Sequence, residues 1–344
     1  MSMTRLEIQQ EIKHLKERYR NIQTIPSNKI EIFTEFLTKI YGRGQRSIVA
    51  VNEINLKVES GVHGFLGPNG AGKTSTINML IGAISISRGR ANIRGFRAGS
   101  IKSRRIIGFL PQDPVFYKNM TGMQYMMYMA QLNGLAKHEA RHKIQDLFRT
   151  LELEDAQDRK IGKYSGGMKQ RLGIAAALVH EPEILILDEP TANLDPIGRA
   201  KIIEKIKALS KRMSVFVSSH ILSEIEQMCE KVTIINRGSI ILSDTIKNIK
   251  EMYSASENVF ILDTNANNRV LLALKNKESV TKAWIDVNDN KIHVVPSNNK
   301  EFQEIIPIIM AESNAVLKGF FQQETTLQDI FIDLMERQER RYYD

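Results

Sequence analysis

The stretch that decides the fold is FLGPNGAGKTST, residues 65–76. Gly67 is followed by four residues and then by Gly72, Lys73 and Thr74, which is the spacing of a phosphate-binding loop. Glycines let successive backbone N–H groups turn inward around an anion, and a helix that begins near Lys73 adds its positive end. The predicted contacts with phosphate are Gly67, Pro68, Asn69, Gly70, Ala71, Gly72, Lys73, Thr74 and Ser75.

Two carboxylates further along the chain complete a site of this kind. The Lys73 ammonium suits the β- and γ-phosphates, and the Thr74 hydroxyl is a hard oxygen ligand for Mg²⁺. The stretch EILILDEP, residues 183–190, is an apolar strand that ends in Asp188 and Glu189. Two carboxylates at the end of a buried strand are costly unless they meet a cation or water. We predict that Asp188 holds Mg²⁺ and that Glu189 orients or polarises the attacking water.

Four shorter motifs carry further polar groups. FLPQDP (109–114) places Gln112 just after a strand, where its amide can reach Mg²⁺ or the water, and TANLDP (191–196), which alone reads as a turn, ends in Asp195. SSHILSEI (218–225) places His220 between a strand and a helix, which Ser218 or Ser219 is expected to cap. KYSGGMKQRL (163–172) reads as a second phosphate-binding helix start, with Ser165 before two glycines.

Strand-like and helical runs alternate through most of the chain. Continuous apolar strands between helices predict an α/β fold with a largely parallel sheet, preceded by an antiparallel β region. The predicted domains are a helical extension (1–35) with an amphipathic helix over 3–24, a main domain (36–250), and an α+β domain (251–344) in β-α-β-β-α-β order. Thr326 is expected to cap the last helix, with Asp329 three residues on.

Charge and composition limit where this chain is expected to work and which partners it is expected to meet. No apolar run approaches 18 residues, and the first residues lack the apolar core of a signal peptide, so we expect a cytoplasmic chain. A single cysteine, Cys229, excludes an internal disulfide. Residues 1–250 carry a net charge of +14 and residues 251–344 one of −5. The basic part is expected to meet anions, and composition does not choose between nucleotide phosphates, an acidic membrane face and nucleic acid.

In order, Gly67–Thr74, Gln112, YSGGMKQR, ILILDEP, ANLD and SSH resemble the nucleotide-binding domain of ATP-binding cassette (ABC) ATPases, over residues 36–250. The resemblance implies a P-loop fold that includes a helical subdomain. It implies that Tyr41 stacks on adenine, that Gln112 couples nucleotide to a transmembrane partner, and that His220 contacts the γ-phosphate. It also assigns Asp195 to a loop that crosses a dimer interface, and assigns the signature motif to Ser165, Gly166, Gly167 and Met168. Tyr164 and Met168 replace the leucine and glutamine that are common there.

The same resemblance implies an activity and partners. These ATPases hydrolyse ATP with Mg²⁺, using residues that match Glu189, His220 and Gln112. Two subunits, identical or different, sandwich two ATP molecules and work at the inner membrane face with permease subunits on separate chains, without nucleic acid. The stretch FFQQETTLQDIFIDLM (320–335) resembles the end of ATPases of the ABC-2 exporter class. The alternative is a soluble ABC ATPase that acts in iron–sulfur assembly, on ribosomes or on DNA.

Overall fold

The computed structural model describes residues 30–42, 46–254, 259–287, 289–322 and 326–343, so the helix predicted for residues 3–24 lies outside it. The chain forms two compact units, Met1–His220 with Thr233–Leu242, and Ile221–Val232 with Ser243–Asp344. This division follows contacts and differs from the boundaries at 36 and 250 that we propose from sequence. No helix in the described part of the chain is both long and apolar enough to cross a membrane.

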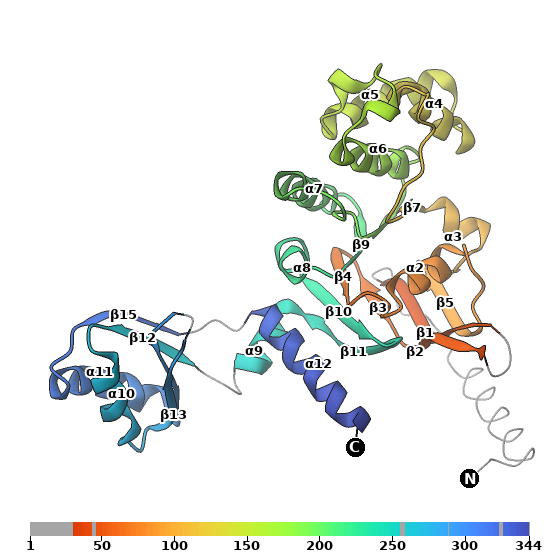
Figure 1. The fold of residues 1–344 in the computed structure, drawn as a ribbon. Helices are drawn as coiled ribbons and strands as arrows, with labels where there is room; N and C mark the ends of the chain where they lie inside the picture. The colour runs from red at the N-terminus through yellow and green to blue at the C-terminus, as the bar shows by residue number, and fades with distance from the viewer. Residues whose placement is uncertain (1–29, 43–45, 255–258, 288, 323–325, 344) are drawn as a thin grey trace, which may run out of the picture. The chain divides into compact units, whose positions relative to one another are not determined.

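The central sheet has six strands in the order β11-β10-β4-β9-β8-β7 (Figure 1). These strands are β4 (Val62–Leu66), β7 (Ile107–Leu110), β8 (Ile184–Asp188), β9 (Ser214–Ser219), β10 (Lys231–Asn236) and β11 (Ser239–Thr245). The neighbours from β4 through β9 and β8 to β7 run parallel. Every residue of β4, β8 and β9 is buried, as expected for strands covered on both faces. The predicted α/β fold with a largely parallel sheet is therefore confirmed.

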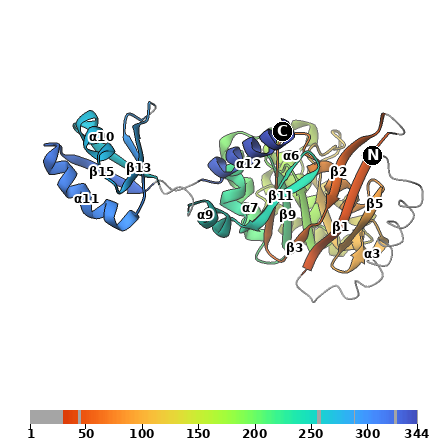
Figure 2. The same ribbon diagram turned by 90° about the horizontal axis from the view of Figure 1, so that it is seen from below.

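A second, antiparallel sheet precedes most of the parallel strands, as predicted. Its strands are β1 (Ile30–Tyr41), β2 (Ile48–Ile54), β3 (Lys57–Glu59), β5 (Arg88–Ile93) and β6 (Phe96–Arg97). Figures 1 and 2 both show β1 beside β2 and β5, and β1 pairs antiparallel with both. The helical extension predicted for residues 1–35 is wrong at its end, because β1 begins at Ile30. Phe36 has a φ of 47°, and the pairing with β2 shifts after Leu37. These irregularities break the alternation that identifies a strand.

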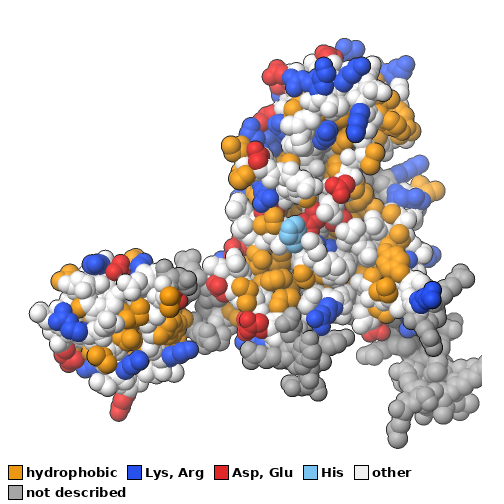
Figure 3. Space-filling model, in the orientation of Figure 1, with side chains coloured by type: hydrophobic (Ala, Val, Ile, Leu, Met, Phe, Trp, Pro, Cys, Tyr) orange, Lys and Arg blue, Asp and Glu red, His pale blue; other side chains and the backbone are white. Residues whose placement is uncertain are grey.

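The helices of the first unit fall into two sets. They are α2 (Lys73–Ile81), α3 (Ile101–Arg105), α4 (Gly122–Leu132), α5 (Lys137–Thr150), α6 (Gly166–Leu178) and α7 (Pro196–Leu209). Helices α4, α5 and α6 pack on one another in a group that lies away from α2 (Figure 1). The buried face of α5 is Ala140, Ile144 and Phe148, spaced by four residues. Lys and Arg side chains are frequent on the surface of this helical group (Figure 3).

The second unit holds the predicted β-α-β-β-α-β order. Its elements are α8 (Leu222–Met228), α9 (Ile246–Ser254), β12 (Phe260–Thr264), α10 (Asn267–Lys275), β13 (Val280–Ile285), β14 (Ile292–Pro296), α11 (Asn299–Glu312), β15 (Leu317–Gln322) and α12 (Leu327–Tyr343). The sheet order is β13-β14-β12-β15, and these neighbouring strands pair antiparallel. Phe260, Phe302 and Leu274 lie in its core. The predicted cap is confirmed, since the Thr326 N–H donates to Asp329 Oδ2 at 3.0 Å and the Asp329 N–H to Thr326 Oγ1 at 3.2 Å.

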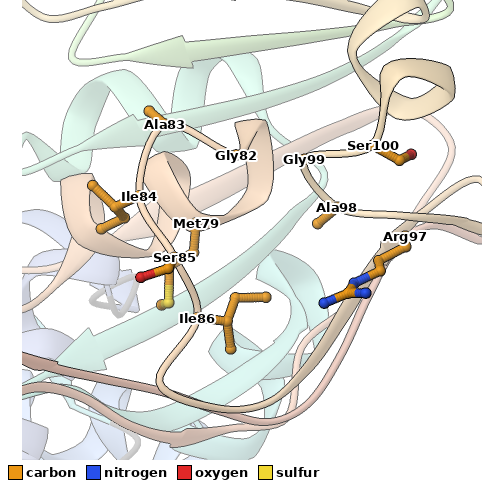
Figure 4. Close-up of a pocket in the computed structure, with 10 residues that line it drawn as sticks. All are labelled: Met79, Gly82, Ala83, Ile84, Ser85, Ile86, Arg97, Ala98, Gly99 and Ser100. Carbon is orange, nitrogen blue, oxygen red and sulfur yellow. The ribbon is translucent and has the colours of Figure 1, made fainter.

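The C-terminal end of α2 is closed by a glycine in close contact with another glycine. Gly82 has a φ of 76°, and its N–H donates to the carbonyls of the last helical turn. A Cβ at Gly82 would lie 2.2 Å from Gly99 Cα. The two glycines line a cavity of about 510 Å³ together with Met79, Ser85 and other neighbours (Figure 4). This cavity lies at the end of α2 remote from Lys73, so it is separate from the predicted phosphate site.

Gly82→Ala should therefore destabilise the protein more than a glycine change of the same backbone type. Gly134 is the matched control, because it has a φ of 84° and a Cβ there would meet nothing within 4 Å. The left-handed backbone should cost each alanine roughly 1 kcal/mol, and the clash at Gly82 should add about 1–3 kcal/mol. Urea unfolding of both variants measures the difference. Equal losses would contradict a close approach of Gly82 to Gly99.

Candidate functional site

The predicted polar residues gather at the carboxyl ends of the parallel strands. The phosphate-binding loop follows β4, Asp188 ends β8, His220 follows β9, and Gln112 follows β7 by two residues. Because these strands are neighbours and parallel, their ends meet at one edge of the sheet. This edge is where open α/β sheets bind ligands.

Lys73 is buried inside the phosphate-binding loop. Its Nζ donates to the carbonyl oxygens of Gly67 at 2.8 Å and Pro68 at 3.3 Å, and lies 3.1 Å from Glu189 Oε1. Gly72, with a φ of 105°, is the N-cap residue just before α2, and a Cβ there would lie 2.6 Å from the Ala50 carbonyl oxygen. The loop therefore needs a glycine at this position, and it holds the ammonium at the start of α2.

Glu189 links Lys73 to His220. One carboxylate oxygen contacts Lys73, and the other, Oε2, lies 2.6 Å from His220 Nδ1. Glu189 has a φ of 50°, which costs a residue with a side chain on the order of 1 kcal/mol or more. Its N–H is fixed by β9, since it lies 3.0 Å from Ser218 Oγ and 3.2 Å from the Ser218 carbonyl oxygen. The strained backbone thus places a buried carboxylate between two basic side chains.

Asp188 lies beside Glu189 with different partners. Ser218 Oγ donates to Asp188 Oδ1 at 2.5 Å. Burial raises the pKa of Asp188, and hydrogen bonds from Ser218 and Thr74 oppose that shift. A cation near these oxygens would favour the ionised form. The pairing of Asp188 with the Thr74 hydroxyl provides two hard oxygen donors, which suits Mg²⁺ held jointly by protein, phosphate and water.

The role of Ser218 corrects one sequence prediction. We expected Ser218 or Ser219 to cap a helix, but both are buried in β9, and α8 begins after Ile221 without a side-chain cap. Ser218 instead faces Asp188, its register partner on β8. The prediction was wrong because the sequence SSH does not indicate which strand lies next to the strand that contains Ser218.

Tyr41 reaches the loop from the antiparallel sheet. It ends β1, its Oη lies 3.2 Å from Ser75 Oγ, and the residue is 41% exposed. The Lys39 ammonium lies 5.0 Å from the ring centroid. An exposed aromatic ring beside the start of α2 has the placement needed for stacking on a nucleotide base.

Gln112 lies in an exposed part of the loop after β7. The same loop packs on α6, because a Cβ at Gly173 would lie 2.5 Å from Leu110 Cδ1, 3.7 Å from Phe116 and 3.8 Å from Pro114. The Gln112 loop is therefore in contact with the helix that begins at the second glycine motif.

Ser165 and Asp195 start two neighbouring helices. Ser165 Oγ accepts the Met168 N–H at 3.2 Å and caps α6, and Asp195 Oδ1 accepts the Gly198 N–H at 2.8 Å and caps α7. Ser165, Gly166, Gly167 and Asp195 line a shared cavity of about 290 Å³. A Cβ at Gly167 would meet nothing within 4 Å. No neighbour in the described structure requires a glycine here, which leaves room for a group from outside the chain.

Comparisons with known proteins agree with this geometry. The family model described as ABC transporter matches residues 51–192. The bacitracin transport ATP-binding protein BcrA of Bacillus licheniformis is 44% identical over 215 residues, which is 61% of this chain and 68% of BcrA. The linearmycin resistance ATP-binding protein LnrL of Bacillus subtilis (strain 168) is 30% identical over 309 residues, covering 88% and 97% of the two chains. This chain belongs to the ABC transporter ATP-binding proteins.

A solved structure supports the fold of this ABC ATPase. An ATP-binding subunit of an ABC transporter superposes with a TM-score of 0.58 and 27% identity, over 65% of this chain and 93% of the other. The chain is therefore an ATP-binding and ATP-hydrolysing subunit of the ABC type. Among the described residues, no cluster of three or more His, Cys, Asp or Glu suits a metal ion.

Proposed function

We propose that two ABC subunits pack head to tail, with each ATP between the phosphate-binding loop of one subunit and the Ser165–Gly167 motif of the other. The observation that carries this proposal is the open surface around Gly167, in a cavity at the starts of α6 and α7. The helical group that contains α6 lies away from α2, which follows the phosphate-binding loop (Figure 1). The N-termini of α2 and α6 can bind one γ-phosphate from opposite sides if each comes from a different chain.

Within each site, we assign separate roles to the residues around Lys73. ATP phosphates compete with the Gly67 carbonyl and the Glu189 carboxylate for the Lys73 ammonium. Glu189 freed from this contact orients the attacking water and accepts its proton, while His220 holds the other carboxylate oxygen. Asp188 and Thr74 would hold Mg²⁺, which neutralises phosphate charge when bound. Tyr41 supports the base, and Gln112 connects the site with a transmembrane subunit.

We further propose that the pair drives export through transmembrane subunits on separate chains, at the inner face of the membrane. The relatives support this direction, since one is a linearmycin resistance protein and resistance by a transporter requires removal of the compound. The likeness to LnrL covers 88% of this chain, so it extends into the second unit. A basic surface also suits the anionic lipids of an inner membrane face.

Mixing two inactive variants tests the two-subunit site. Lys73→Ala damages the phosphate-binding loop, and Ser165→Arg blocks the opposite surface, so each variant alone should lose about 10²-fold or more in turnover. A 1:1 mixture should regain roughly a quarter of wild-type turnover, because half of randomly formed dimers are mixed and each keeps one intact site. Phosphate release measures the recovery. A mixture no more active than its components would contradict the proposal.

A further inference from the structure

The turn after α5 holds a glutamate in a strained backbone conformation. Glu152 has a φ of 54°, and its neighbours Leu151 and Leu153 are 0% and 1% exposed. The two buried leucines anchor the turn on both sides. A left-handed conformation costs a residue with a Cβ roughly 1–2 kcal/mol, and glycine would avoid the cost. Contacts of the Glu152 side chain therefore have to offset this cost.

The Glu152 carboxylate contacts three basic side chains from two other helices. Lys205 Nζ lies 2.9 Å from Oε1, while Lys201 Nζ and Arg171 Nη1 lie 3.5 Å and 3.3 Å from Oε2. The hydrogen bond from Lys205 lowers the pKa of Glu152, with a smaller effect from Lys201, so the group is ionised at neutral pH. Arg171 belongs to α6 and the two lysines to α7.

Arg171 extends this cluster to the Ser165–Gly167 motif. Its Nη1 also donates to the carbonyl oxygens of Leu151 and Glu152, both at 3.2 Å, and its Nε donates to the Gly167 carbonyl oxygen at 3.4 Å. The turn at Glu152 thus presents two carbonyls and a carboxylate to one guanidinium, and that guanidinium holds the first turn of α6. Arg171 and Lys201 also line the cavity shared by Ser165 and Asp195.

We propose that Glu152, Arg171, Lys201 and Lys205, here called the Glu152 clamp, fix the spacing between α6 and α7 at the two-subunit ATP site. Glu152 is a positioning residue in this scheme. The proposal rests on the proposed function, because the surface that it positions acts on an ATP held by the second subunit. An error of about 1 Å in such a site can cost on the order of 10²-fold in rate.

Exposure limits what the clamp does for stability. The Glu152 side chain is 48% exposed, and exposed ion pairs add little to the stability of a fold. Arg171 is only 15% exposed and has four acceptor contacts, so its placement is well defined. The consequence of losing the carboxylate should therefore appear in turnover rather than in unfolding.

Two substitutions separate positioning from simple structural support. Glu152→Gln keeps the side-chain shape and removes the charge, whereas Glu152→Gly removes the carboxylate and relieves the backbone strain. Both should lower kcat for ATP about five- to tenfold at saturating ATP. Both should leave ATP affinity of the phosphate-binding loop unchanged, and Glu152→Gly should melt no lower than the wild type. Glu154→Gln is the matched control, because Glu154 lies close to Glu152 in the chain and forms an ion pair with Arg149 of α5 at 3.5 Å.

The outcomes distinguish this inference from the proposed function. Wild-type turnover by the Glu152 variants would overturn the clamp. A loss of turnover accompanied by a lower melting temperature and a weaker ATP affinity would also overturn it, because general damage to the fold would then explain the loss. Wild-type turnover per subunit should rise with protein concentration if two subunits share the site. Turnover independent of concentration would instead overturn the two-subunit site on which the clamp depends.

Discussion

The Glu189→Gln variant is expected to bind ATP normally and to hydrolyse it about 10²–10³-fold more slowly than the wild type. Glutamine keeps the size of the side chain and can still contact Lys73 and His220, which lie 3.1 Å and 2.6 Å from the two carboxylate oxygens. An amide does not accept the proton of the attacking water. Phosphate release should therefore fall, while binding of a fluorescent ATP analogue should remain.

The same variant should accumulate a closed dimer in the presence of ATP. ATP that is bound but not cleaved keeps bridging the two subunits, which shifts the population toward closure. Light scattering should detect a doubling of mass when ATP is added. Glu183→Gln is the matched control, since Glu183 precedes the same strand at its other end and pairs with Arg94 at 3.0 Å. Normal hydrolysis by Glu189→Gln would remove the assigned role of Glu189.

The parts of this site that follow from sequence are those governed by local pattern. Glycine spacing from Gly67 to Gly72 predicts a loop before a helix, and α2 begins at Lys73. The apolar run before Asp188 predicts a buried strand, and β8 is buried throughout. Parallel neighbours then bring the two motifs to one edge of the sheet without further information.

The parts that the sequence could not predict depend on pairing between distant segments. Ser218 contacts Asp188 only because β9 and β8 are adjacent in one register. The early part of β1 is hidden by irregular pairing near Leu37. In the sequence, Glu152 is one of many charged residues. Only the structure shows that it lies in a left-handed turn and contacts side chains of α6 and α7. In each case the deciding feature is a contact between residues far apart in the chain, or a backbone conformation that no local sequence pattern reveals.

Lys73→Ala should have the largest effect, with turnover lowered about 10³-fold or more and ATP affinity clearly reduced. Lys73 is 6% exposed, and its ammonium donates to the carbonyl oxygens of Gly67 and Pro68. Because the ammonium is already fixed in place, it binds phosphate without a further loss of side-chain freedom. Its interaction with phosphate should therefore be stronger than that of a surface lysine. Alanine removes that charge and also leaves the buried Glu189 carboxylate without its ammonium partner.

Lys39→Ala is the control that distinguishes the loss of phosphate binding at Lys73 from the general effect of removing a buried lysine. Lys39 is 8% exposed, and its Nζ donates to the Ser85 carbonyl oxygen at 2.8 Å, so it is a buried ammonium with a backbone partner. It also lies 5.0 Å from the Tyr41 ring, so a modest loss of ATP affinity is expected. Lys39→Ala should nevertheless keep turnover within about tenfold of the wild type at saturating ATP. If both variants lost turnover equally, burial rather than contact with phosphate would explain the effect of Lys73.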